Sequence, residues 1–149
     1  MNQLMQVALA VGLLWMIPEG VLAQIADSSP AQVVAPDSRP AVQAAGKWLR
    51  YFDRGRLEEC WERGSVEFQR QLPKERWIES MRELRGVYGP PSRRKLRSTT
   101  FSPGRDPSKG QSVFVIEYDS RFPEAENRVE QVLVALENGE WRVVGYSLR

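Results

Sequence analysis

The chain has 149 residues, no histidine, one cysteine and a formal net charge of +2. Without histidine there is no imidazole base, so Ser-His-Asp triads, Cys-His dyads and helical His-Glu-x-x-His zinc sites are excluded. A single cysteine cannot close an internal disulfide or fill a cysteine-rich metal site, and we predict neither a metal nor a cofactor. The net charge is too small to indicate a nucleic-acid partner. Carboxylate, tyrosine, lysine and arginine chemistry remains, or no catalysis at all.

An apolar run near the N-terminus predicts export. Residues 7–17 are all apolar, but a membrane-spanning helix needs about 20 such residues. Small residues follow, so we expect a signal peptide over residues 1–23 that is cleaved after Ala23, giving a periplasmic or secreted protein. Gln24 stands where a lipoprotein would carry its acylated cysteine, so no stable membrane anchor is expected after cleavage. Residues 1–6 contain no Lys or Arg, which makes an uncleaved anchor the alternative.

Residues 24–40 are rich in Pro, Ser and Ala and have no sustained periodicity, which predicts a flexible linker. The folded unit is then a single domain over residues 41–149. A chain of that length can bury one core without disulfides. Cys60 lies beside Trp61 in a helical apolar pattern, so we expect its thiol to be buried and unreactive.

The first half of this unit predicts three helices. The first starts near Ala41, after Ser38 and Pro40, and Gly55 ends it. The second is weakened by Gly64, and the third runs from Pro73 to the Gly89-Pro90-Pro91 segment. The inward positions on the first helix are Ala41, Val42, Ala45, Trp48, Leu49 and Phe52; on the second Leu57, Cys60, Trp61 and Phe68; on the third Trp77, Ile78, Met81, Leu84 and Tyr88.

Beyond Pro91 the apolar period changes to two, which predicts strands over 93–101, 111–122, 128–137 and 140–148. Asn138-Gly139 is a two-residue hairpin turn that needs positive φ at both positions. Residues 102–110 form a polar hairpin loop, and Gly145 predicts a bulge or a bend in the last strand. The layout is α+β, with about three helices packed in a curved four-stranded antiparallel sheet.

Two sets of residues carry a resemblance to a known family. The first is Trp48…Asp53-Arg54-Gly55…Trp61…Phe68…Trp77…Arg85, followed by Gly89-Pro90…Arg94. The second is Glu117-Tyr118…Phe122…Glu130…Asn138-Gly139-x-Trp141-Arg142-Val143-x-Gly145-Tyr146. Through them, residues 41–149 resemble the bacterial exported family DUF4019, a domain of unknown function. The resemblance implies a cone-shaped, cystatin-like roll of the nuclear-transport-factor-two type, and it brings no established activity.

Arg85 is the first candidate for a functional residue. Helical phase places it on the apolar arc of the third helix, where a buried charge needs a partner. Asp53 borders the apolar stripe of the first helix and Glu117 ends an apolar run. We therefore expect Arg85 to pair with one of these acids, bidentately where the geometry allows. The pair is interpreted as a buried strut that ties helix to sheet, with the floor of a binding pocket as the alternative.

A basic stretch in the first predicted strand is the second candidate. Alternation places Arg93, Lys95 and Arg97 on one face, and Arg94, Leu96 and Ser98 on the other. We interpret the basic face as a solvated one that also discourages edge pairing. Binding to an anionic surface, such as envelope lipid, is the alternative.

Two classes of function follow. The first is a secreted, non-catalytic module that binds a small ligand or an envelope protein through the mouth of the cone or through the sheet. The second is a small acid–base enzyme with Asp53 or Glu117 as base and Tyr118 or Tyr146 as hydrogen-bond donor. An enzyme needs a water-excluded pocket in which an acid and a donor converge. No tight constellation of that kind is apparent in the sequence, which favours the module.

Overall fold

The computed structural model describes residues 34–103 and 112–149. The predicted signal peptide, most of the predicted linker and most of the 102–110 loop lie outside the described residues. Within the described ranges, no helix is long and apolar enough to cross a membrane. Helices precede strands along the chain: α2 (Arg39–Asp53), α3 (Leu57–Glu62), α4 (Val66–Gln71), α5 (Lys74–Tyr88), β1 (Arg93–Ser102), β2 (Val113–Phe122), β3 (Ala125–Glu137) and β4 (Glu140–Leu148). This is the predicted α+β class.

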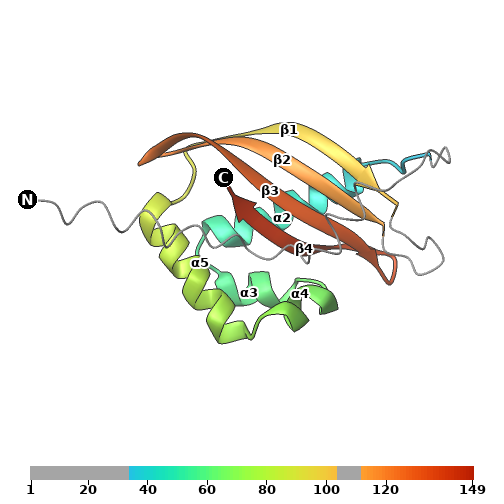
Figure 1. Ribbon diagram of the computed structural model, residues 1–149, viewed down its shortest axis with the longest axis horizontal. Helices are drawn as coiled ribbons and strands as arrows, with labels where there is room; N and C mark the ends of the chain where they lie inside the picture. The colour runs from blue at the N-terminus through green and yellow to red at the C-terminus, as the bar shows by residue number, and fades with distance from the viewer. Residues whose placement is uncertain (1–33, 104–111) are drawn as a thin grey trace, which may run out of the picture.

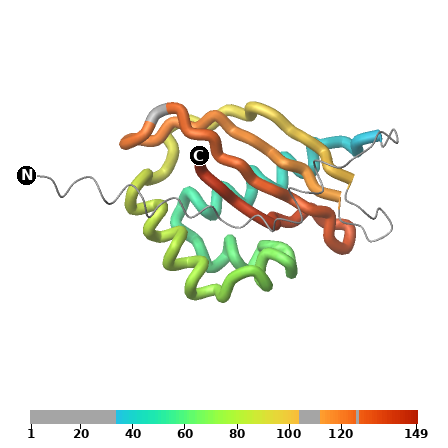
Figure 2. The backbone as a smooth tube through the Cα atoms, in the orientation of Figure 1, coloured from blue at the N-terminus to red at the C-terminus, as the bar shows by residue number. Residues whose placement is uncertain are grey.

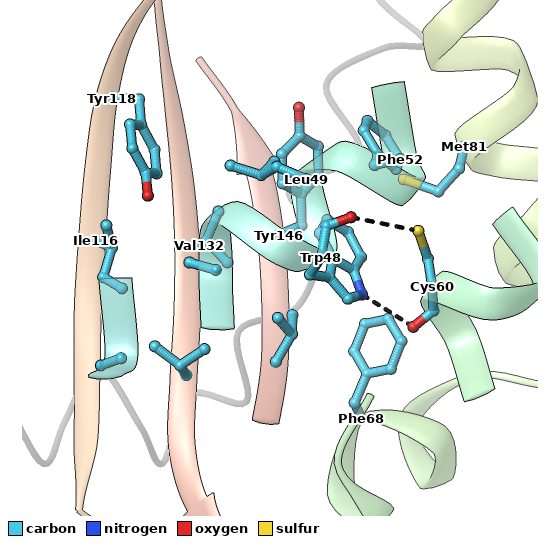
Figure 3. Close-up of a cluster of buried hydrophobic side chains, with 14 of the residues drawn as sticks. Trp48, Leu49, Phe52, Cys60, Phe68, Met81, Ile116, Tyr118, Val132 and Tyr146 are labelled. Atoms are coloured by element: carbon cyan, nitrogen blue, oxygen red, sulfur yellow. Dashed lines mark hydrogen bonds between the residues drawn. The ribbon is translucent and has the colours of Figure 1, made fainter. Parts of the chain in front are cut away.

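α2 is the central helix, and the sheet curves over it (Figure 1). Pro40 occupies its first turn, as predicted, and Gly55 follows its end with φ +70°. Its inward residues meet the sheet on one side and residues of α3 and α5 on the other (Figure 3). The predicted positions Ala41, Ala45, Trp48, Leu49 and Phe52 are all buried, and Val42 is partly buried.

The predicted second helix is two short helices, because the chain turns at Gly64 and Ser65. The Ser65 Oγ accepts a hydrogen bond from the Phe68 amide at 3.0 Å and so caps α4. The Ser65 amide donates to the Val143 carbonyl at 2.8 Å, which attaches this turn to β4. A Cβ at Gly64 would lie 2.3 Å from the Phe68 Cδ1, so this turn requires glycine.

α5 confirms the predicted third helix. It begins after Pro73, and its C-cap is Gly89 at φ +66°, in the left-handed region that glycine favours. Trp77 and Met81 are buried in the core. Of the other predicted inward positions, Ile78 and Leu84 are partly buried against the core and Tyr88 packs edge-on against Phe122.

The four strands form one antiparallel sheet in the order β1-β2-β3-β4. Asn138 and Gly139 have φ values of 52° and 82°, which confirms the predicted hairpin turn. Leu133 pairs with Gly145 but Val134 pairs with Val143, so the predicted irregularity at Gly145 is a bulge. Figure 2 shows the curvature of the sheet around the helices, which is consistent with the roll that the resemblance implies.

A second bulge, at Arg97, corrects the predicted faces of the first strand. Leu96 pairs with Tyr118, whereas Ser98 pairs with Glu117, so one extra residue separates the two pairs. Because the extra residue reverses the alternation, Ser98 lies on the outer face of the sheet and not beside Arg94 and Leu96. Arg94 lies on the inner face, toward α2.

Candidate functional site

Arg94 is held between two carboxylates at the end of α2. Its Nε and Nη2 donate to the Glu130 carboxylate at 2.6 and 2.9 Å. Its Nη1 and Nη2 donate to the Asp53 carboxylate at 2.7 and 3.0 Å. Both pairs are bidentate, an arrangement that fixes the plane of the guanidinium group as well as its position. Arg94 therefore ties helix α2 to strands β1 and β3.

Glu130 is a fully buried acid in this cluster. Besides Arg94, it accepts hydrogen bonds from the Ser120 hydroxyl and from the Tyr146 hydroxyl, the latter at 2.9 Å. Burial by itself would raise the pKa of Glu130, but the Arg94 contacts and the two hydroxyl groups outweigh it and lower the pKa. Glu130 is thus held ionised, with both oxygens occupied.

The inner face also carries the two tyrosines predicted as hydrogen-bond donors. Tyr146 is buried between Trp48 and Phe52, with ring centroids 5.6 and 4.8 Å away. Its pKa lies well above the ordinary value, first because of burial and then because of the Glu130 charge. Burial likewise raises the pKa of Tyr118. The acid–tyrosine pair that does converge, Glu130 with Tyr146, is closed to solvent.

Arg85 is mostly buried, as expected from its helical phase, and lies against the end of α2. Its Nη2 donates to the Phe52 carbonyl at 3.1 Å and its Nη1 to the Gly89 carbonyl at 3.0 Å. Its guanidinium group stacks on the Phe52 ring at 4.8 Å, and its nearest contact with the Asp53 carboxylate is 3.7 Å. The expected pairing of Arg85 with one of the two acids is therefore present as an ion pair with Asp53, but it is not bidentate, because Arg94 already occupies both Asp53 oxygens. Arg85 ties α5 to α2, and Arg94 is the strut to the sheet.

Glu117 lies on the outer face, away from α2 and Arg85. Its carboxylate accepts hydrogen bonds from the Ser98 hydroxyl at 3.0 Å and the Gln131 amide at 3.2 Å. Arg149 is its ion-pair partner, at 2.5 Å. The predicted grouping of Glu117 with Arg85 is wrong, because strand alternation points Glu117 and its neighbour Tyr118 to opposite faces.

An open depression of about 620 Å³ lies beside the charged cluster. One wall is a stripe of α5, and the other comprises the end of α2, the connecting turn and the start of α3. The two walls approach each other where Arg85 of α5 lies 3.7 Å from Asp53 at the end of α2. The lining residues are Asp53, Arg54, Gly55, Arg56, Leu57, Glu58, Glu59, Ile78, Arg82, Arg85 and Pro90. Its volume is in the range of small-ligand pockets, about 300–1,000 Å³.

The basic residues predicted on the first strand are exposed on the outer face. Arg93 and Lys95 are solvent-accessible, and Arg97 forms an ion pair with Asp119 at 3.2 Å. The three cations lie on the same outer face as Glu117 and away from the depression, so the sequence-predicted binding residues belong to two separate places.

Acids that could bind a metal ion and the single cysteine are the remaining reactive side chains. In the part of the chain that the structure describes, no three acidic or cysteine side chains gather closely enough to hold a metal ion. Cys60 is completely buried, as predicted, and burial raises its pKa to about 12. The Cys60 carbonyl accepts the Trp48 indole N–H at 2.9 Å. The cysteine is therefore part of the packing between α2 and α3.

Arg94 and Glu130 are central to the site, and reasoning from the sequence did not select them. A signal was present for Glu130, because it stands in phase with the inward positions Val132 and Val134 of β3. A charged side chain on the inward face of a strand needs a buried partner. Arg94 lies in phase with Leu96, on the face opposite the exposed cations. Predicting the contact between Arg94 and Glu130 requires the order of the strands in the sheet, which places β1 within reach of β3.

Comparison with known proteins identifies the family. The family model described as a protein of unknown function (DUF4019) matches residues 44–146, which covers α2 to β4 except for the ends. No match was found among curated proteins or among solved structures. The match spans the residues that form the charged cluster and the depression, and the chain therefore belongs to the DUF4019 family.

Proposed function

We propose that the protein is an exported, non-catalytic module that binds a small ligand in the depression between α5 and the turn from α2 to α3. The observation that carries the proposal is that the buried acid–tyrosine pair is closed to solvent, whereas the depression beside it is open. Glu130 and Tyr146, which have the chemistry of an acid–base pair, are closed off by Arg94. The opening beside them is lined by four arginines, three acids and apolar side chains.

The fixed geometry of the depression supports binding. Arg85 is held by two carbonyl groups and by the Phe52 ring, so its position does not depend on a ligand. Asp53 is held by Arg94 in the same way. A wall whose side chains are already oriented loses little conformational entropy when a ligand binds. Ile78 and Leu57 add apolar surface to the polar groups, a composition typical of small-molecule sites.

The enzyme alternative has weaker support. Asp53 lines the depression, but both its oxygens accept hydrogen bonds from Arg94. Glu117 and Tyr118 lie on opposite faces of the sheet. A general base has to reach a substrate proton directly or through one water. The acids of this cluster are occupied by arginine, so binding is the function that the geometry favours.

Ligand-observed saturation-transfer NMR tests the proposal on the full chain, with benzoate, benzamide and benzylamine as probes. We expect at least one probe to receive saturation from the protein and to remain chemically unchanged. Ile78→Trp fills the depression and should abolish the transfer. Val87→Trp, on an exposed part of α5 outside the depression, should leave it intact. Equal transfer to both variants, or conversion of a probe, would contradict the proposal.

A further inference from the structure

The charged side chains that line the depression do not all pair with one another. Its four arginines face three acids: Arg54, Arg56, Arg82 and Arg85 against Asp53, Glu58 and Glu59. Asp53 accepts hydrogen bonds from Arg94 and lies 3.7 Å from Arg85. Glu59 is paired with Arg56 through contacts of 2.6 and 2.7 Å. Two of the four arginines and one of the three acids take part in neither of these pairs.

Arg54 and Arg82 are those two arginines. Among the described side chains, neither forms a hydrogen bond, an ion pair or a ring contact. They lie on different elements, with Arg54 directly after α2 and Arg82 within α5. On α5, Ile78, Arg82 and Arg85 are spaced at i, i+4 and i+7, so they share one face of the helix. The depression therefore has free cationic groups on both walls.

We infer that the depression binds a small organic oxyanion, a carboxylate or a phosphate ester, between Arg54 and Arg82; this inference rests on the proposed function. Guanidinium groups match the geometry of both oxyanions, because two parallel N–H groups meet two oxygens. Arg85, which also lines the depression, adds a positive charge held in place by two carbonyl groups. Ile78 and Pro90 provide a surface for the apolar part of the ligand.

Glu58 gives the site a selectivity that a plain basic patch lacks. It lines the depression, and no hydrogen bond or ion pair engages it among the described residues. Its carboxylate repels a ligand that places a second anionic group on the α3 side of the depression. A single oxyanion head group attached to an apolar body, with no second anionic group, is the ligand shape that these charges favour.

Titration calorimetry of the full chain tests the inference, with phenyl phosphate, inorganic phosphate and neutral benzamide as probes at low ionic strength. Phenyl phosphate should bind more tightly than inorganic phosphate, because only the former uses the apolar wall. Its affinity should fall by about tenfold in Arg82→Gln and in Arg54→Gln, the size expected for one charge-assisted contact. Raised salt should weaken the binding further.

Arg50→Gln is the matched control, since Arg50 is exposed on α2 and does not line the depression. It removes the same charge and should change the affinity by less than about twofold. Equal losses in Arg50→Gln and Arg82→Gln would overturn the inference in favour of long-range charge alone. A third outcome is that benzamide binds, phenyl phosphate does not, and the benzamide binding is lost in Ile78→Trp. This result would overturn the inference of an anionic ligand and leave the proposed function standing. Failure of all three probes to bind at the depression would contradict both.

Discussion

Arg94 of β1 and Glu130 of β3 are joined by hydrogen bonds of 2.6 and 2.9 Å that pass over the intervening strand β2. The contact spans the sheet on its inner face, and Ser120 of β2 completes it by donating to Glu130. Asp53 extends the same contact to α2. A single guanidinium group thus joins three elements that meet only in the folded chain.

Replacing Arg94 should strongly lower the free energy of unfolding. Arg94→Gln leaves Glu130 buried with an uncompensated charge, and the expected loss is about 3–5 kcal/mol in the free energy of unfolding. Urea denaturation measures it. Arg93→Gln removes a neighbouring exposed charge and should change stability by less than about 0.5 kcal/mol. Similar effects of the two variants would contradict the assignment of Arg94 as the strut.

The pH dependence of stability should report the ionised state of Glu130. The folded-state pKa of Glu130 lies below its ordinary value of 4.5, so the unfolded chain takes up the proton more readily. Its contribution is therefore complete above about 4.5 and is lost as the pH falls through the folded-state pKa. We expect Glu130→Gln to be less stable than wild type at pH 7, and the gap to narrow on acidification. A gap that stays constant from pH 7 to pH 3 would contradict this account.

Two glycines with opposite surroundings provide a test of the packing. Gly64→Ala places a methyl group 2.3 Å from the Phe68 ring, and overpacking of this kind costs about 1–3 kcal/mol. Gly86 lies in α5 with open space around it, so Gly86→Ala should stabilise by up to about 1 kcal/mol. Thermal denaturation compares the two variants. A Gly64→Ala variant as stable as wild type would show that the turn at Gly64 is not as tight as described.

The Cys60 thiol should be inert in the folded protein. Its pKa of about 12 leaves almost no thiolate at pH 8, and the side chain is completely buried. We expect no reaction with a disulfide reagent in buffer and stoichiometric reaction in concentrated urea. Rapid reaction of the native protein would mean that the contact between α2 and α3 opens.

Export remains a prediction from the sequence alone. The apolar run at residues 7–17 and the small residues before Gln24 predict that the mature chain begins at Gln24. Mass spectrometry of the protein from a periplasmic or culture fraction measures the start directly. A full-length chain retained in the membrane fraction would support the uncleaved anchor instead.

Local patterns in the sequence were sufficient for most of the fold. The stripe from Ala41 to Phe52 defined α2, and Asn138-Gly139 defined the last hairpin, because both depend on neighbours in the chain. For the second helix, the sequence indicates a weak point at Gly64 but not its separation into two helices, and it does not predict the bulge at Arg97. Each is fixed by a partner far along the chain, Val143 for the first and the residues of β2 for the second.

The candidate site was less predictable than the fold for the same reason. Asp53 and Arg85 were identified as charges on apolar helix faces, and both line the depression. They form an ion pair at 3.7 Å, but the bidentate partner of Asp53 is Arg94, and helical phase contains no information about the strand that supplies it. Glu117 was placed with them although it faces the other side of the sheet. Long-range register decides such contacts, and a single sequence does not specify it.

The most direct test of the ligand site is an amide chemical-shift map of the ¹⁵N-labelled full chain, titrated with benzoate, benzamide and benzylamine. We predict saturable shifts for at least one probe, confined to residues 53–59, which line the depression, and to the amides at or next to Ile78, Arg82, Arg85 and Pro90, which form its other side. The amides of β1 near the exposed cations Arg93 and Lys95 should not shift. The absence of shifts at the depression for all three probes, or saturable shifts at β1 alone, would contradict the account.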